Sequence, residues 1–437
     1  MKRATRALCW SPLAQVLLLV GTTVASPASA EPEVTPSERV RRNVVVRAEP
    51  STNSAQLGAL LPGDEADLVG EVPGWYQVRL QGGLVGYVSK AWTVLRADGS
   101  TQPLASASGP LKLHVIDVGT GLAIFIEGPG FTMIYDGGSQ DDLAMGNENR
   151  ILAYILAARP DVSTIDHLVL SHPHKDHLEL LPDVFRKFSV RHVWDSGAVN
   201  KTRGYCRFLQ SVAAEPGVQY HNAIATGGTH RVTFAGKTCS GEVVLPQADM
   251  MTLAPVQLGG ATTMSILYRD ASTHHDPNEN TVVVRLDHAQ RRILIAGDAE
   301  GGERLLPGSP PSPGSIEAKL LESSAAELSA DVLVVGHHGS LTSSRRAFLD
   351  AVGADIFVIS SGPHPYSKKV LPDPEIEAEL RSRGRLLQTD LDDDSCELVD
   401  RQKTGPDFDE SPGGCDNVMV TISADGGISA DYSRIPD

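Results

Sequence analysis

The sequence predicts a layered α/β domain preceded by a small β-barrel, and three observations carry this prediction. From residue 111 onward, short apolar runs that end in polar residues alternate with helix-like segments, a pattern typical of strands and helices packed in layers. Before that region, short β-prone runs separated by Pro- and Gly-containing turns indicate a small barrel. Between the two lies a small, polar stretch without apolar periodicity, which we interpret as a linker.

The composition limits the class of protein. The chain has 437 residues, of which 41% are hydrophobic and 21% charged, so it is an ordinary globular chain long enough for two domains. Its formal net charge of −16 argues against a broad nucleic-acid-binding surface, so nucleic acid is expected only as a substrate. No stretch after residue 30 reaches the length of a membrane span, and no integral membrane association is expected.

The first thirty residues have the pattern of a secretory signal peptide. A basic start precedes an apolar run at 13–20, and Ala28-Ser29-Ala30 is a small-residue cleavage signature. The alternative of a retained anchor is disfavoured because the apolar run is too short to span a bilayer. The mature protein is therefore expected to be secreted or periplasmic. The predicted organisation is a signal peptide (1–30), a barrel domain (42–95), a linker (96–110) and a larger domain (111–437).

Four cysteines remain after removal of the signal peptide. An even number in an exported protein permits two disulfide bonds with three connectivities. We favour Cys206–Cys239 and Cys396–Cys415, because each pair brackets one segment that looks irregular. Both cysteines of the first pair lie within the stretch 200–275, which has the pattern of an irregular insertion. A cysteine-rich zinc site is the alternative, but the close spacing that such sites use is missing.

The stretch Ser-His-Pro-His-Lys-Asp-His at 171–177 carries the strongest chemical signal. It follows an apolar run and precedes a helix-like segment. His172 and His174 lie two residues apart, so in an extended backbone they point the same way and can bind one ion. Asp176 and His177 come where the chain turns into the helix and can reach a second ion. A polar surface turn is the alternative, but three His and one Asp this close together favour a metal site.

Further polar residues follow apolar runs elsewhere in the larger domain, namely Asp136, Asp298 and the pair His337-His338. One ion needs about four ligands, so the combined set suffices for two divalent metal ions bridged by a carboxylate. Asp298 is the natural bridge, because its run lies between the others and a carboxylate offers two oxygens. A mixture of imidazole and carboxylate ligands suits zinc, with manganese as the alternative.

Residues 42–95 resemble bacterial SH3-like domains. The resemblance rests on Asn43-x-x-x-Arg47, Trp75-Tyr76 and Gly86-Tyr87-Val88. It implies a small barrel that either binds cell-wall peptide or acts as a spacer. The segment 31–40 before it is polar and is expected to be a mobile N-terminus.

The larger domain resembles the metallo-β-lactamase superfamily, whose HxHxDH motif is HPHKDH here. Within it, the sequence is similar to the branch that contains the metallohydrolase domain of competence DNA-uptake channel proteins and phosphocholine esterases. The resemblance implies a four-layer αββα sandwich. It also rests on VIDVGTG (115–121), IYDGG (134–138), NENTVVVRL (278–286), LIAGDAE (294–300) and VGHHGSLTSS (335–344).

The resemblance also implies a role for each site residue. His172 and His174 would bind one metal, and Asp176 and His177 the other, with Asp298 as the bridge. One of His337 and His338 would complete the second metal site, and the other would contact the substrate.

Four further expectations concern residues at and around the metals. Asp136 would orient a ligand from behind, and Asp176 would help to orient the nucleophile. Many superfamily members have a histidine where this chain has Asn280, which is expected to be a weak ligand. His274 and His275 lie nearby and are expected to substitute for it.

These features favour a secreted metal-dependent hydrolase that cleaves a phosphodiester, in nucleic acid or a phosphocholine-type ester, by a metal-activated water. One alternative is hydrolysis of a lactone or β-lactam carbonyl. The other is a cell-wall-binding protein with a degenerate metal site.

Overall fold

The computed structural model of the chain describes residues 33–37, 40, 43–60, 64, 66–80, 84–96, 109–140, 146, 149–224, 229–237, 239–251, 253–389 and 416–433. The chain divides into two compact units, Met1–Gln102 and Pro103–Asp437. The predicted signal peptide, most of the predicted linker and the pair Cys396–Cys415 lie outside the described residues.

The first unit is a small β-structure around a core of valines that includes Val46, Val78 and Val88. The expectation of a mobile segment at 31–40 is wrong for β1 (Glu33–Pro36), which pairs antiparallel with two strands because Val34 is fully buried in the core. The strands are ordered β3-β2-β6-β5-β4-β1-β7, with β2 Val44–Arg47, β3 Gln56–Leu60, β4 Ala66–Val72, β5 Trp75–Arg79, β6 Val85–Ser89 and β7 Thr93–Arg96.

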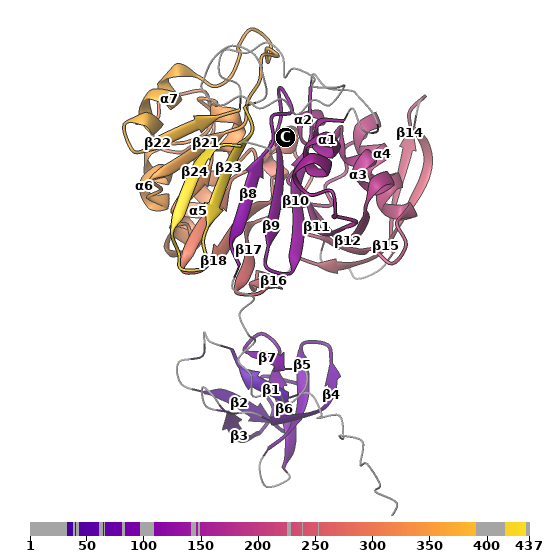
Figure 1. The fold of residues 1–437 in the computed structure, drawn as a ribbon. Helices are drawn as coiled ribbons and strands as arrows, with labels where there is room; N and C mark the ends of the chain where they lie inside the picture. The colour runs from indigo at the N-terminus through magenta and orange to yellow at the C-terminus, as the bar shows by residue number, and fades with distance from the viewer. Residues whose placement is uncertain are drawn as a thin grey trace, which may run out of the picture. The chain divides into compact units, whose positions relative to one another are not determined.

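The second unit contains a 10-stranded sheet in the order β14-β15-β13-β12-β11-β10-β9-β8-β23-β24 (Figure 1). Its central strands β10, β11 and β12 are parallel neighbours. The strands are β8 Leu111–Val115, β9 Ala123–Gly128, β10 Phe131–Gly137, β11 Thr164–Leu170, β12 Ser189–Asp195, β13 Gln219–Asn222, β14 Thr229–Ala235, β15 Ser240–Met250, β23 Val418–Ile422 and β24 Ile428–Tyr432.

A 7-stranded sheet in the order β16-β17-β18-β19-β20-β21-β22 faces it. From β19 onward the neighbouring strands of this sheet are parallel. The strands are β16 Val256–Gly259, β17 Thr262–Tyr268, β18 Val283–His288, β19 Arg291–Ile295, β20 Val332–Val334, β21 Ile356–Ile359 and β22 Arg385–Gln388.

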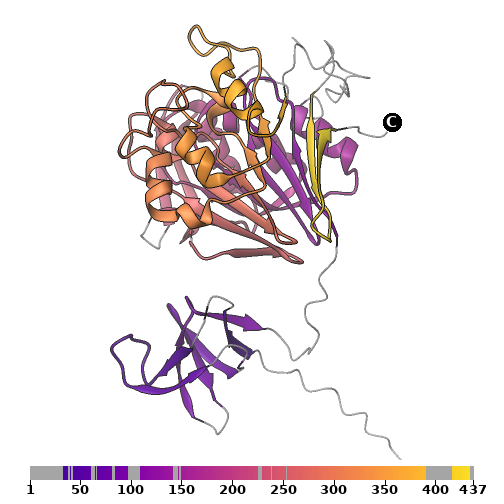
Figure 2. The same cartoon turned by 90° about the vertical axis from the view of Figure 1, so that its left-hand side faces the viewer.

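The two sheets pack face to face, because apolar side chains of both form one buried core that includes Leu113, Ile124, Val284 and Ile293. A second core joins the outer face of the 10-stranded sheet to four helices, and a third joins the outer face of the 7-stranded sheet to three (Figures 1 and 2). The helices are α1 Arg150–Ala158, α2 Lys175–Leu178, α3 Leu181–Lys187, α4 Arg203–Ala214, α5 Ile316–Ser324, α6 Arg346–Val352 and α7 Pro374–Arg381.

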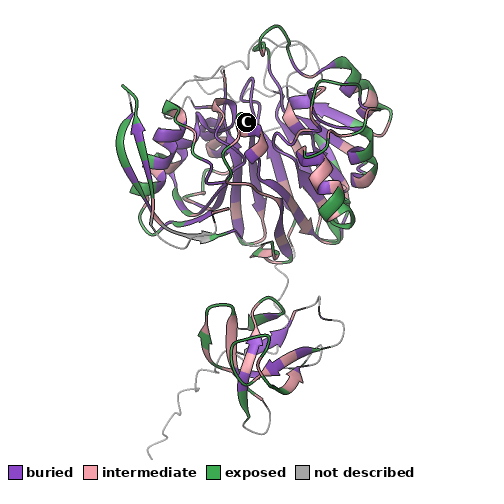
Figure 3. Cartoon of the chain, turned by 180° about the vertical axis from the view of Figure 1, so that it is seen from behind, coloured by how far each residue is buried: buried purple, intermediate pink, exposed green. Residues whose placement is uncertain are grey.

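The predicted four-layer αββα sandwich is thereby confirmed. Its strands are largely buried, whereas exposed residues gather on the outer helices and on loops (Figure 3). At the C-terminal end of the described residues, β23 pairs antiparallel with β24, and this hairpin joins the sheet through β8. No helix among the described residues is long and apolar enough to cross a bilayer.

The expectation of an irregular insertion at 200–275 is wrong for most of that segment. It contains α4 and the strands β13 to β17. β13 and β16 have only four residues each, and β17 is buried along most of its length, so these strands lack the long alternation that periodicity identifies. The predicted Cys206–Cys239 disulfide is confirmed and joins α4 to the segment between β14 and β15, with Cα atoms 6.2 Å apart.

This disulfide should contribute measurably to stability. The two cysteines are 33 residues apart, so the cross-link restricts a long loop of the unfolded chain, and its loss should lower the free energy of unfolding by about 3–4 kcal/mol. The measurement is urea unfolding of a Cys206→Ser, Cys239→Ser double variant beside the oxidised wild type. Equal midpoints and slopes would contradict the expectation.

Candidate metal centre

The histidine-rich loop lies at one edge of the sandwich, where strands of both sheets end. The loop follows β11, and Asp136 is the second-to-last residue of the neighbouring strand β10. Asp298 follows β19, and His337 and His338 follow β20, which lies beside it. Since the carboxyl ends of neighbouring parallel strands meet at one edge, segments far apart in sequence come together there.

Two glycines let the loop approach the sheet. A Cβ atom on Gly138 would lie 1.9 Å from the carbonyl carbon of Asp176, and one on Gly121, whose φ is +149°, would lie 2.5 Å from its oxygen. The backbone N–H of Leu122 donates to that oxygen over 2.9 Å. The motifs IYDGG and VIDVGTG are therefore explained by close backbone packing against the loop.

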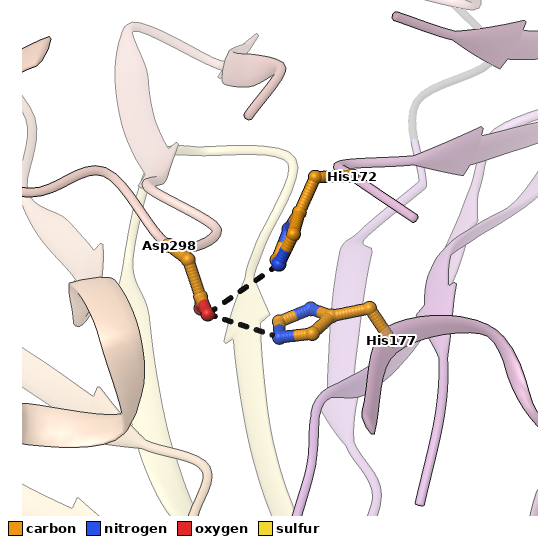
Figure 4. Close-up of side chains that lie close together, drawn as sticks. All are labelled: His172, His177 and Asp298. Carbon is orange, nitrogen blue, oxygen red and sulfur yellow. Dashed lines mark ion pairs between the residues drawn. The ribbon is translucent and has the colours of Figure 1, made fainter. Parts of the chain in front are cut away.

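His172, His177 and Asp298 form a first buried group (Figure 4). Asp298 Oδ2 lies 3.6 Å from His172 Nε2 and 3.3 Å from His177 Nε2. The figure shows the two imidazole rings, which come from the same loop, directed at the single carboxylate from the opposite sheet.

Asp176, His177 and His338 form a second buried group that shares His177 with the first. His338 Nε2 lies 3.6 Å from Asp176 Oδ2 and 3.7 Å from Asp298 Oδ1. Asp298 thus has one oxygen beside each group, which is the position that a bridging carboxylate needs.

Hydrogen bonds on the far side of the rings fix their orientation. His177 Nδ1 is 2.8 Å from Asp136 Oδ2, and His338 Nδ1 is 2.7 Å from the carbonyl oxygen of Ser360. Each ring therefore directs Nε2 into the cluster, as metal-bound histidines do. Among the described residues, no hydrogen-bond partner reaches the buried atoms His177 Nε2, His338 Nε2 or Asp298 Oδ1. Buried polar atoms normally have partners, so these donor atoms fit a divalent metal ion.

The charges of the cluster are strongly coupled. Burial would raise the pKa of Asp298, but the surrounding histidines outweigh it and hold that pKa well below its usual value. Burial would lower the pKa of His177, yet Asp298 and Asp136 raise it well above 6.5. For His172, burial dominates together with the neighbouring His177, and its pKa is lowered well below 6.5. The ionised carboxylates of the cluster therefore favour a positive charge between them, such as a protonated histidine or a metal ion.

His174 lies beside the cluster but belongs to neither buried group. Its Nδ1 is 3.0 Å from His172 Nε2, and its side chain is 34% exposed. Two ligands of a tetrahedral zinc with Zn–N bonds of about 2.05 Å are roughly 3.3 Å apart, so the pair is spaced suitably for one ion. His337 also belongs to neither buried group: its side chain is 18% exposed, and its Nε2 lies 3.8 Å from Asp298 Oδ2.

The structure does not place Asn280 as a ligand. Its amide nitrogen donates to the carbonyl oxygens of Asp270 and Ser272, each over 2.9 Å, so the side chain organises a loop. His274 does not substitute for it, because its two nitrogens face Asp270 and Glu279. The spacing of NENT alone could not show which asparagine faces the cluster.

Two functional contacts were not predicted from the sequence. The Tyr366 hydroxyl donates to Asp176 Oδ2, and its ring stacks on His338 with centroids 6.0 Å apart. Glu300 Oε1 lies 2.8 Å from His337 Nδ1. Tyr366 and Glu300 each lie on a loop that follows a strand, and this position is the one sequence signal that could have suggested them.

The segment that follows the loop carrying His337 and His338 is anchored by two buried side chains, Arg345 and Glu317, through contacts with backbone groups. Arg345 is fully buried, and its guanidinium donates to the carbonyl oxygens of Glu303 and Leu305. Glu317, also buried, accepts from the backbone N–H of Arg345 over 3.1 Å. Burial raises the pKa of Glu317 to about 8, against the opposing effect of these donors and the Arg345 charge.

Comparison with known proteins identifies relatives for both units. Residues 42–94 match the family described as Bacterial SH3 domain, and residues 116–213 match the Metallo-beta-lactamase superfamily. Competence protein ComA of Neisseria gonorrhoeae is 34% identical over 118 residues, which are 26% of this chain and 15% of that protein. Recombination protein 2 of Haemophilus influenzae is 25% identical over 251 residues, which are 57% of this chain and 24% of that protein. The matches therefore span less than a quarter of either relative.

Among solved structures, the metallo-beta-lactamase fold protein YhfI from Bacillus subtilis is similar over 64% of this chain and 96% of its own. The identity is 13% and the TM-score is 0.37. At these values the likeness adds nothing to the architecture described above.

Substitution of Gly138 by Ala should displace the metal loop. The new methyl group would overlap backbone atoms of Asp176 and His177, neither of which can move without the loop, so we expect a loss of about 2 kcal/mol or more in unfolding free energy. Gly109→Ala is the matched control, because its Cβ would meet only Pro129 at 3.4 Å. Thermal and urea unfolding measure both, and equal effects in the two variants would contradict the prediction.

The stability of the chain should depend on pH through Glu317. Between pH 4.5 and about 8 the unfolded carboxyl is ionised while the folded one keeps its proton, so the folded state binds more protons and stability decreases as pH rises. Glu317→Gln cannot titrate and should lack this component. Urea unfolding at pH 5, 6.5 and 8 should show the wild type losing more stability than Glu317→Gln. Parallel pH profiles would be the contrary result.

Proposed function

We propose that this chain, in which a bacterial SH3 domain precedes a metallo-β-lactamase superfamily domain, is a metal-dependent hydrolase that cleaves a phosphodiester. The observation that carries the proposal is the convergence of His177 Nε2, His338 Nε2 and Asp298 Oδ1. These three buried donor atoms come from two sheets and have no hydrogen-bond partner among the described residues.

The residues proposed to bind metal follow from this geometry. His172 and Asp298 would bind one divalent ion, with His174 as a further ligand at the exposed side. Asp176, His177 and His338 surround the second position, and the shared Asp298 would bridge the two. Zinc, with manganese as the alternative, would supply an activated water nucleophile and Lewis-acid stabilisation of the developing charge.

The surrounding residues orient these groups. Asp136 holds the Nδ1 side of His177, and the Ser360 carbonyl oxygen holds that of His338, so neither ring can turn away. Tyr366 holds the Asp176 carboxylate by its hydroxyl. With His338 in the second group, His337 is left to contact the substrate, and Glu300 and Thr342 fix its Nδ1 at 2.8 and 2.7 Å.

Two observations bear on the substrate. One relative is named a recombination protein, and recombination acts on nucleic acid, which is a phosphodiester polymer. In contrast, a cavity of about 410 Å³ beside the site carries the carboxylates of Asp276, Glu279 and Glu300 in its lining and no basic side chain. Such a cavity would repel a polyanion, so it favours a small diester, such as a phosphocholine-type ester, at this side of the site.

The signal-like start and the SH3 domain support a location outside the cytoplasm. We propose that the enzyme is secreted or periplasmic and that its SH3 domain binds cell-wall peptide.

A panel of bis-p-nitrophenyl phosphate, single-stranded DNA, a phosphocholine ester and a lactone tests the substrate class. Turnover of the lactone alone would replace the phosphodiesterase proposal with carbonyl hydrolysis.

Removal of His177 should abolish the metal centre. This side chain is shared by both groups, so His177→Ala should lower the bound metal, measured by elemental analysis, and reduce hydrolysis by at least about 100-fold. His275→Ala is the control, because His275 is exposed, and it should retain metal and activity. A chelator should inhibit the wild type, with recovery on adding zinc or manganese. Full metal content and activity in a folded His177→Ala variant would refute the proposal.

A further inference from the structure

The amide of Asn278 is a buried polar group at the site with unfilled hydrogen-bonding capacity. The residue is 4% exposed, and its Oδ1 has no hydrogen-bond partner among the described residues. Its backbone is fully engaged, because its N–H donates to Asp276 Oδ1 over 3.0 Å and its carbonyl oxygen accepts from Thr281 N over 3.0 Å. The 3₁₀ helix Pro277–Asn280 thus holds the residue in place and leaves only the end of the amide open.

The other end of this amide faces the cluster. Asn278 Nδ2 is 3.4 Å from His337 Nε2, and that nitrogen is 3.8 Å from Asp298 Oδ2. The position of the His337 ring is set independently, because Glu300 and Thr342 both contact its Nδ1. Asn278 therefore lies directly beside the side chain that we assign to substrate contact.

In either orientation of the Asn278 amide, one of its two polar atoms lacks a hydrogen-bond partner among the described residues. A 180° turn exchanges oxygen and nitrogen without moving any other atom. In one orientation the nitrogen faces His337 and the oxygen has no partner. In the other the oxygen faces His337 and the nitrogen is free to donate. A buried amide atom without a partner costs free energy, so its retention beside the site points to a ligand that completes it.

Asn280 shows the contrast within the same short helix. Both asparagines are buried, but the amide nitrogen of Asn280 makes two hydrogen bonds to backbone carbonyl oxygens. One asparagine has a structural role, and its neighbour two residues earlier has an amide left open at the cluster.

We propose that Asn278 is a substrate-binding residue that donates its amide N–H to a non-bridging oxygen of the phosphoryl group, while its amide oxygen accepts from His337 at the other end. This inference rests on the proposed function, because a phosphoryl substrate supplies the oxygen. The amide turns so that its oxygen accepts from His337 Nε2–H and its nitrogen faces the ligand, and His337 then acts on the substrate through Asn278. The residue would fix the orientation of the phosphoryl group and would not bind metal.

The test measures binding of inorganic phosphate to the full chain loaded with zinc, by calorimetry, beside its metal content. Asn278→Ala should raise the dissociation constant of phosphate by about 10-fold or more, since a hydrogen bond to a charged group is lost. Asn278→Asp keeps the shape of the side chain but repels the anion, so it should weaken binding at least as much. Both variants should retain the metal content and melting temperature of the wild type.

Asn280→Ala is the matched control. It should lower the melting temperature, because the loop at Asp270 and Ser272 loses two hydrogen bonds, and the folded protein should bind phosphate within about three-fold of the wild type. If Asn278→Ala alone failed to fold, the shape-conserving Asn278→Asp would decide the question.

Three results would overturn the assignment. They are unchanged phosphate affinity in folded Asn278 variants, loss of metal on substitution of Asn278, and absence of phosphate binding by the zinc-loaded wild type. Hydrolysis of bis-p-nitrophenyl phosphate by the wild type separates this inference from the proposed function. Active enzyme with unaffected Asn278 variants refutes the role of Asn278 alone. Weakened phosphate binding in a chain that cleaves no diester refutes the proposed reaction alone.

Discussion

The contact between Asp136 and the histidine loop is the interaction on which the site depends. One oxygen of this buried carboxylate accepts from the Ser171 backbone over 2.6 Å, and the other lies 2.8 Å from His177 Nδ1. A single side chain thus fixes both the start and the end of the loop. Asp136 itself has a φ of 57°, a left-handed conformation that Asp tolerates better than most residues, and this turns its carboxylate from the strand toward the loop.

The sandwich supplies the second half of the site. His172 and His177 come from the 10-stranded sheet, whereas Asp298 and His338 follow strands of the opposite one. Their separation is therefore set by the apolar core between the sheets, which resists compression and expansion because it is closely packed. Donor atoms from two rigid layers meet with little freedom, and such rigidity is what a site with defined ligand geometry requires.

The loop after β20 shows how an unfavourable backbone is kept in place. His337 and His338 have φ values of 49° and 52°, which cost free energy for residues with a side chain. The Ser343 hydroxyl donates to the Gly336 carbonyl oxygen over 2.7 Å, and the buried pair of Arg345 and Glu317 holds the segment that follows. These contacts keep the two adjacent imidazoles pointing to different neighbours. The His338 ring belongs to a buried group of possible metal ligands, and the His337 ring lies at the more exposed edge of the cluster.

By itself, the sequence determined the fold class, the Cys206–Cys239 pair and the residue types of the cluster. Apolar runs that end in polar residues, the paired glycines of IYDGG and the density of histidine in HPHKDH are local patterns, and local patterns can be recognised without coordinates. Strands within 200–275 were missed because β13 and β16 have only four residues and β17 does not alternate buried and exposed positions, so their periodicity is weak. Only the tertiary structure decided which histidine of the pair at 337–338, and which asparagine of the segment 278–280, faces the cluster. Residues one or two positions apart in a tight turn or 3₁₀ helix point to different sides, and spacing does not specify the side that packing selects. Contacts with Asp298 and His337, on neighbouring loops of the 7-stranded sheet, direct His338 and Asn278 toward the site and leave Asn280 to its own loop.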